Sequence, residues 1–147
     1  MRHRVLLTAL GLATALAGAS ELSAQRSYVG GRSAGDQGAP FSQAVWIDDT
    51  LYLSGMLGLA QGGPPDTAEE EARNVLNSIQ RVLEGEGLTM NHLVSVQIFA
   101  SDVGDYQAFN DVYRTYFTEM FPARAFIGSG TLLFNARFEI QAIASRK

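Results

Sequence analysis

Two charged residues near the C-terminal end of the chain, Arg124 and Glu139, lie beside or within apolar segments, where a charged side chain is unexpected. Arg124 directly precedes the apolar run Ala125–Ile127, and Glu139 lies within an almost uncharged terminal stretch. Burying either charge is costly unless it is paired or hydrogen-bonded. A guanidinium can hold a carboxylate through two parallel bonds, and a partly dry carboxylate can serve as a general base. A surface ion pair for Arg124 and an exposed edge-strand position for Glu139 are the alternatives.

The common catalytic constellations are missing from the sequence. It has no Gly-rich phosphate loop, no paired metal-ligand spacing and no Gly-x-Ser-x-Gly elbow. It also has no cysteine, which excludes disulfides, thiolate catalysis and thiolate metal sites. Past the N-terminal segment His92 is the only histidine, and its place in a predicted turn indicates a solvated surface role. A Ser-His pair is therefore disfavoured.

The N-terminal 24 residues have the pattern of an export signal. A positive head at Arg2–Arg4 precedes the apolar run Val5–Ala19, which is shorter than the roughly 20 residues of a membrane-spanning helix. We predict a signal peptide over residues 1–24, cleaved after Ala24 or, as the second choice, after Ala19. The mature protein is then periplasmic or secreted, without stable membrane association. An uncleaved anchor, or a misassigned start before a cytoplasmic protein, is the alternative.

The composition fits one small soluble domain with an acidic surface. The chain has 147 residues, of which 46% are hydrophobic and 18% charged, and its formal charge is −4 at pH 7. Nucleic-acid-binding proteins usually carry a basic patch that displaces counterions from phosphates, and no Lys/Arg cluster occurs here. We therefore expect no nucleic-acid partner.

The element pattern predicts an α/β (α+β) domain over residues 38–147, preceded by a flexible leader over residues 25–37 that is rich in Gly and Ser. Thr67–Glu70 supplies a helix-capping pattern, and apolar residues then recur at three- and four-residue steps. The predicted order is ββαβαββ, with strands at 43–47, 51–56, 93–99, 125–132 and 136–144, and helices at 68–83 and 109–120.

This order places two helices on one face of a mixed sheet and leaves the other face uncovered. An apolar face cannot stay in water, and the chain has no third helix to cover it. A second copy of the same chain is the available cover, so we predict a homo-oligomer.

Six short segments, in order from Gly38 to Lys147, resemble the signatures of the reactive intermediate deaminase family, also called RidA or YjgF/UK114. The pairing of a Pro-Ala-Arg element with a Glu-bearing last strand is the most specific of them. The segments are Pro40–Ala44, Leu53–Gly55, Asn74 with Leu76-Asn77, Asn110 with Tyr113, Phe121–Arg124 and Phe138–Ala144.

The resemblance implies a chorismate-mutase-like homotrimer with clefts between its subunits. It implies a 2-iminobutanoate/2-iminopropanoate deaminase-like hydrolase, which converts enamines or imines such as 2-aminoacrylate to 2-oxo acids and ammonia, without a metal or organic cofactor. Arg124 would hold the substrate carboxylate. Glu139 would position and polarise the attacking water and then return a proton to the departing nitrogen.

The resemblance also implies five further residues of the cleft. Asn110 would help to line it, Ser54 and Gly55 would bring a hydroxyl and bare backbone beside it, and Phe126 and Ile127 would form its walls. The residues alone leave open a helix-surface amide, a strand-end kink and two core side chains.

Departures from the family pattern indicate an altered cleft. Phe41 stands where a Tyr is frequent, Met56 replaces a frequent Gln, Leu133 replaces a common Pro, and the loop over residues 57–66 is short. Phe41 would still line the substrate site without the hydroxyl. We expect imine hydrolysis to survive with a changed substrate preference.

The main alternative function is a non-catalytic trimer that binds a small carboxylate or a partner protein in the same clefts. Binding alone would need Arg124 and tolerate loss of Glu139, whereas catalysis needs both. A chaperone-like holdase and a nuclease are weaker alternatives, the second because of the acidic charge.

Overall fold

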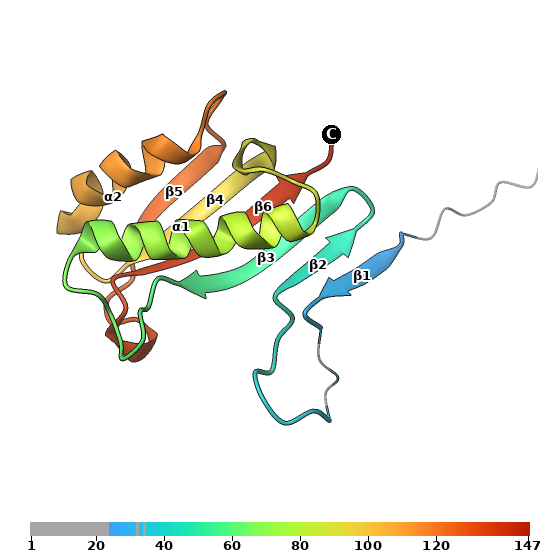
Figure 1. The fold of residues 1–147 in the computed structure, drawn as a ribbon, viewed down its shortest axis with the longest axis horizontal. Helices are drawn as coiled ribbons and strands as arrows, with labels where there is room; N and C mark the ends of the chain where they lie inside the picture. The colour runs from blue at the N-terminus through green and yellow to red at the C-terminus, as the bar shows by residue number, and fades with distance from the viewer. Residues whose placement is uncertain (1–23, 32, 34) are drawn as a thin grey trace, which may run out of the picture.

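The computed structural model describes residues 24–31, 33 and 35–147, so the predicted signal peptide lies, apart from Ala24, outside the described residues. A mixed sheet in the strand order β1-β2-β3-β6-β4-β5 carries two α-helices on one face (Figure 1). The elements are β1 (Arg26–Val29), β2 (Ala44–Ile47), β3 (Thr50–Leu57), α1 (Ala68–Gly85), β4 (Leu93–Ala100), α2 (Tyr106–Tyr113), β5 (Ala123–Gly128) and β6 (Phe138–Ser145). Four 3₁₀ turns join them: η1 (Met90–His92), η2 (Val103–Asp105), η3 (Arg114–Tyr116) and η4 (Leu133–Asn135).

The predicted order ββαβαββ is confirmed from β2 onward, but the prediction of a flexible leader was wrong for residues 26–29. These residues form β1, which pairs antiparallel with β2 from Arg26↔Ile47 to Val29↔Ala44. Three of the four side chains of β1 are exposed, so the strand has no apolar alternation to reveal it. Backbone hydrogen bonds to β2, rather than side-chain burial, hold it at the edge of the sheet.

Helix α1 follows the sequence prediction closely. The Thr67 hydroxyl accepts a hydrogen bond from the Glu70 backbone N–H at 3.2 Å, which caps the first turn. Its apolar stripe packs on the sheet and supplies much of the core, through Ala72, Val75, Leu76, Ile79, Val82 and Leu83.

Helix α2 ends earlier than predicted, at Tyr113 instead of Met120. The apolar residues that suggested a longer helix leave the helical path after η3. Phe117 and Phe121 instead pack on Tyr113, with ring centroids 4.7 and 6.2 Å from its ring. Aromatic contact across a bend therefore replaces the last predicted turn.

The sheet face opposite the helices, called the open face here, mixes polar and apolar side chains. On β6 the residues Phe138 and Ile140 are buried towards the helices, while Glu139 and Gln141 alternate to the open face. The register sets Gln141 beside Gln97 of β4. The expectation of a largely apolar face therefore holds only in part.

Candidate functional site

Arg124 belongs to a cluster on the helix-covered side of β5. It is in register with Val96, which is buried towards the helices. Its Nη1 donates a hydrogen bond to Asn110 Oδ1 at 2.7 Å, and its guanidinium carbon lies 4.8 Å from the Tyr113 ring centroid and 5.8 Å from that of Tyr106. One amide and two aromatic rings hold the guanidinium in place.

Asn110 is 4% exposed, so it is not a helix-surface amide. Its position on α2 is set by the packing of the neighbouring Phe109 into the core. Because its side-chain oxygen accepts from Arg124, we assign it as the residue that orients the guanidinium.

The positive charge of Arg124 is unbalanced within the described part of the chain. Among the residues that the structure describes, no Asp or Glu lies within ion-pair distance of it. Burial raises the pKa of the Tyr113 hydroxyl to about 12, although the positive charge of Arg124 opposes the rise. Tyr113 therefore stays neutral at physiological pH and does not neutralise the guanidinium. A hollow of about 200 Å³ opens at the guanidinium. It is lined by Asn110, Tyr113, Arg114, Phe121, Pro122 and Arg124.

Glu139 belongs to a second cluster, where β3 and β6 meet on the open face. The register passes from Leu53↔Ala142 to Met56↔Ile140, so Ser54 and Gly55 form a bulge opposite one residue. A Cβ atom on Gly55 would collide with Glu139 Oε1, which means that the carboxylate lies against the bare backbone of Gly55. The bulge therefore positions the carboxylate.

Replacing Gly55 with alanine is expected to displace the carboxylate of Glu139, the general base predicted from sequence, and to lower kcat by about 10- to 100-fold, because a shift of about 1 Å in a reacting group can cost that much. The assay is the hydrolysis of a freshly generated imine. Gly85→Ala is the matched control, since a Cβ there meets no atom within 4 Å. An unchanged kcat in Gly55→Ala would show that the carboxylate position does not matter.

The Ser54 hydroxyl is already engaged. It donates a hydrogen bond to the Ser42 carbonyl at 2.6 Å and so ties β3 to the loop before β2. In this structure Ser54 shapes the site, and the bare backbone of Gly55 is what faces Glu139.

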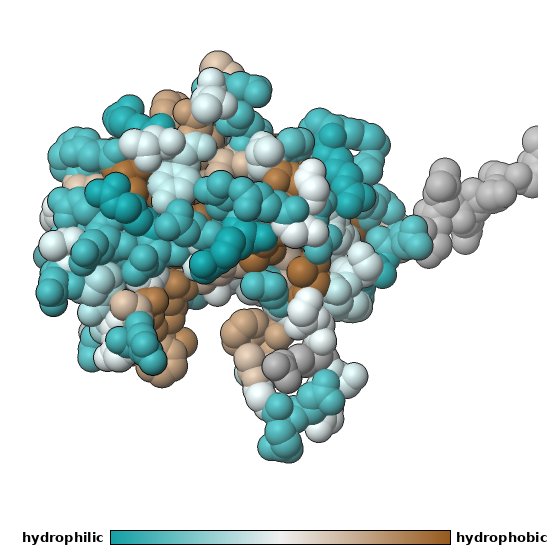
Figure 2. Space-filling view, viewed as in Figure 1, coloured by the Kyte–Doolittle hydropathy of each residue, from teal (hydrophilic) through white to brown (hydrophobic). Residues whose placement is uncertain are grey.

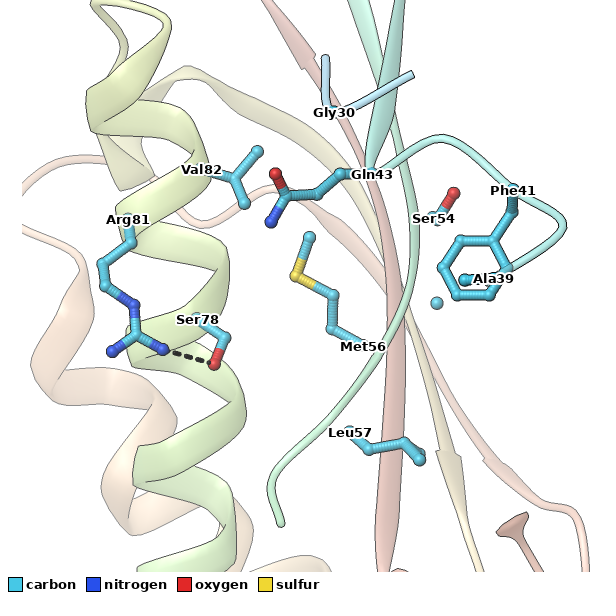
Figure 3. A pocket seen from close by; sticks show the side chains of 11 residues that line it. Gly30, Ala39, Phe41, Gln43, Ser54, Met56, Leu57, Ser78, Arg81 and Val82 are labelled. Carbon is cyan, nitrogen blue, oxygen red and sulfur yellow. Dashed lines mark hydrogen bonds between the residues drawn. The ribbon is translucent and has the colours of Figure 1, made fainter. Parts of the chain in front are cut away.

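A groove of about 550 Å³ runs along the free edge of β3 (Figure 3). The edge is free because the pairing of β2 with β3 ends at Ala44↔Leu53. Phe41, which is 58% exposed, lies with Ser54 on one side of the strand, while Met56, Val82 and Arg81 lie on the side of α1 (Figure 3). Figure 2 shows apolar surface on both sides of a notch between η4 and the loop before β2.

The two predicted catalytic residues are not brought together within one chain. Arg124, Asn110 and Phe126 lie on the helix side of the sheet, whereas Glu139 lies on the open face. Ile127 shares the open face with Glu139, because Phe99 pairs with both residues. The candidate residues therefore divide into an Arg124 half-site and a Glu139 half-site.

Phe126 and Ile127 have different surroundings. The Phe126 ring packs edge-on against Tyr106, Phe109 and Phe138, at centroid distances of 5.1, 5.7 and 6.4 Å. It is thus part of the core beneath Arg124. Ile127 is 40% exposed and is free to form a wall of a cleft.

Sequence reasoning did not place the two tyrosines that flank Arg124 in the site, although Tyr113 belongs to one of the family segments. Tyr106, Asn110 and Tyr113 follow one another at steps of four and three, which places them on one face of a helix, and this spacing could have found them. In the described part of the chain, the Tyr113 hydroxyl is the only buried side-chain polar atom without a hydrogen-bond partner.

His92 is a turn residue, whose Nδ1 accepts from the Thr89 backbone N–H at 3.0 Å.

A search of residues 24–31, 33 and 35–147 finds no cluster of three His, Cys, Asp or Glu side chains that could hold a metal ion. The same residues contain no helix long and apolar enough to cross a membrane.

Comparison with known proteins identifies the family. Residues 32–146 match the model of the family described as endoribonuclease L-PSP. The chain belongs to this family. The resemblance to the RidA or YjgF/UK114 proteins is thereby confirmed, since proteins of those names are among its relatives.

The family relatives include named deaminases. The goat (Capra hircus) 2-iminobutanoate/2-iminopropanoate deaminase is 39% identical over 108 residues, which cover 71% of this chain and 79% of that protein. The human deaminase of the same name is 34% identical over 112 residues, covering 71% of this chain and 79% of that protein.

The fold is shared with solved structures of the family. The YjgF gene product of E. coli has 28% sequence identity and a TM-score of 0.69, covering 74% of this chain and 89% of that chain. The Rid-family protein YyfA of Yersinia pestis has 30% identity and a TM-score of 0.74, covering 82% and 99%.

Proposed function

We propose that this protein hydrolyses reactive enamine or imine intermediates of the 2-aminoacrylate type to 2-oxo acids and ammonia. The observation that carries the proposal is the Arg124 guanidinium, held by Asn110 Oδ1 at 2.7 Å and by two tyrosine rings, with no carboxylate of the described chain paired to it. Such a fixed, unbalanced cation suits the carboxylate of a small substrate. The names of the deaminase relatives support the same reaction.

In this proposal Arg124 binds the substrate carboxylate and Glu139 acts on water. An enamine first takes a proton from solvent on carbon to become the iminium. Glu139 accepts a proton as a water oxygen adds to the iminium carbon, which gives a tetrahedral carbinolamine. It then returns the proton to the nitrogen. The C–N bond breaks as the hydroxyl oxygen forms the C=O bond, the hydroxyl proton passes through Glu139 to the departing ammonia, and the 2-oxo acid and ammonium leave. The iminium carbon is already electrophilic, so this reaction requires no further group.

The division into two half-sites leads us to propose that each complete site forms between two copies of the chain, in a homotrimer. Arg124 and Glu139 face opposite sides of one sheet, so neither side chain can reach the other through the core. A neighbour that covers the open face would bring its own Arg124 half-site towards Glu139. The exposed Phe41, Ile127 and Phe121 are apolar surface suited to that contact.

An endoribonuclease activity, which the family description names, is disfavoured for this chain. The sequence is acidic, with a formal charge of −4, and it has no Lys/Arg cluster to follow a phosphate backbone.

The direct test measures ammonia and 2-oxo acid released from imines that an amino-acid oxidase generates in the assay. Wild-type protein is expected to accelerate hydrolysis. Arg124→Ala is expected to raise KM roughly 10- to 100-fold, the value of one or two charge-assisted hydrogen bonds. Arg26→Ala, an exposed arginine on β1, is the control. A wild-type rate equal to that of buffer across several imines would refute the proposal.

A further inference from the structure

A second carboxylate, that of Glu71, is buried near the start of β6. Its side chain is 0% exposed, although it lies only in the first turn of α1. A carboxylate in such a place is costly unless several donors satisfy it. The mechanism proposed above does not use it.

The donors to the Glu71 carboxylate are on Phe138, the first residue of β6, and on Arg137, which directly precedes it. Its Oε1 accepts from the backbone N–H groups of Arg137 at 2.5 Å and Phe138 at 3.1 Å, and its Oε2 accepts from Arg137 Nη1 at 3.3 Å. The Arg137 guanidinium also donates to the carbonyls of Pro65 at 2.7 Å and Asp66 at 3.1 Å. Two consecutive residues therefore donate to the buried carboxylate, and the loop before α1 holds the Arg137 guanidinium in place.

These contacts end one residue before Glu139. Strand β3 pairs with β6 as far as Leu57↔Glu139 and then leaves the sheet. The Glu71 carboxylate accepts from the backbone N–H groups of Arg137 and Phe138, beyond that point. The residue that follows β3, Gly58, approaches Glu71 so closely that a Cβ atom on it would collide with the Glu71 carbonyl, and its own carbonyl accepts from Asn74 Nδ2 at 3.1 Å. The first turns of α1 thus hold the end of β3 and the start of β6, the strand that carries Glu139.

We infer that Glu71 is a positioning residue, which fixes the Glu139 carboxylate through the backbone of Arg137 and Phe138. This inference rests on the proposed function for its catalytic consequence. The physical reason is that Glu139 is restricted at both ends. Its carboxylate lies against Gly55, and its backbone follows directly from the two residues that Glu71 binds. A carboxylate is needed because one oxygen must accept two N–H groups while the other faces a guanidinium.

The first measurement is the kinetics of Glu71→Gln, which conserves side-chain size but turns an amide NH₂ towards a donor. We expect kcat for imine hydrolysis to fall about 10- to 100-fold. KM should change less than about threefold, because Arg124 holds the substrate carboxylate from the other half-site. Glu69→Gln, an exposed glutamate in the same turn, is the matched control and should behave like wild type.

The second measurement does not depend on catalysis. In protein labelled with ¹³C at glutamate carboxyl carbons, the Glu139 signal is identified by its loss in Glu139→Gln. Glu71→Gln should move that signal, and Glu69→Gln should leave it in place. If Glu71→Gln does not fold, Arg137→Lys, which keeps a cation but loses the planar fork, should give a smaller fall in kcat with the same unchanged KM.

An unmoved Glu139 signal in Glu71→Gln, or an unchanged kcat, would overturn the inference. So would an equal loss through KM alone. Should wild type hydrolyse no imine, the proposed function fails, and the carboxyl signal by itself still decides whether Glu71 positions Glu139.

Discussion

Glutamine in place of Glu139 is expected to lower the kcat of imine hydrolysis by about 100- to 10,000-fold, close to the uncatalysed rate, because general acid–base catalysis contributes about that much. The amide has the same size and can still lie against Gly55, but it cannot accept a proton from water. KM should stay near the wild-type value, since the substrate carboxylate is held by Arg124. The measurement is a full kinetic comparison by ammonia release.

The control is Glu84→Gln, which removes an exposed glutamate of α1. The result also distinguishes the two main functional hypotheses for the cleft, catalysis and non-catalytic binding. A Glu139→Gln protein that keeps the wild-type rate would contradict the proposed general base. If wild type shows no turnover and the Glu139→Gln protein still binds a small carboxylate through Arg124, the non-catalytic binding trimer is the better description of the protein.

Mixing two defective chains is expected to restore activity. Oligomers assembled from equal amounts of Arg124→Ala and Glu139→Gln chains should regain about one quarter of wild-type activity at substrate concentrations below KM. The reason is that a site shared by two chains is intact when an Arg124-bearing chain meets a Glu139-bearing one, which occurs in about one of four random pairings. The assay compares co-refolded mixtures with each variant refolded alone.

Three controls accompany this experiment. Each variant refolded alone sets the background, and the two variants mixed after separate refolding show whether exchange of chains is required. Wild type mixed with the double variant Arg124→Ala/Glu139→Gln controls for dilution. If the co-refolded mixture shows only the sum of its parts, Arg124 and Glu139 do not act across two chains, and the shared-site proposal is wrong.

The alternation of β6 was predictable from sequence. Phe138, Ile140, Ala142 and Ala144 are apolar at every second position, and the structure buries all four. Helix α1 was equally clear, because its capping threonine and apolar stripe act over a few residues. Strand β1 was not predictable, since its stability comes from a backbone ladder with β2 and leaves no side-chain pattern.

The end of α2 shows a different failure. Phe117 and Met120 continue a helical apolar spacing, so periodicity alone extends the helix. In the structure the Phe117 ring packs at a tilt against Tyr113 after the helix ends, and Met120 is exposed. A local pattern could not distinguish packing on the sheet from packing on the helix's own last turn.

By itself the sequence determined which residue types could do the chemistry: an arginine before an apolar strand and a glutamate inside one, in segments that mark a known family. Only the tertiary structure decided that the two lie on opposite faces of one sheet, that Asn110 holds Arg124, and that Glu71 ties α1 to the strand that carries Glu139. The physical reason is the distance along the sequence between the interacting residues. Helix stripes and strand alternation come from neighbours a few residues apart, whereas register, bulges and partly buried ion pairs join residues such as Glu71 and Arg137, 66 positions apart.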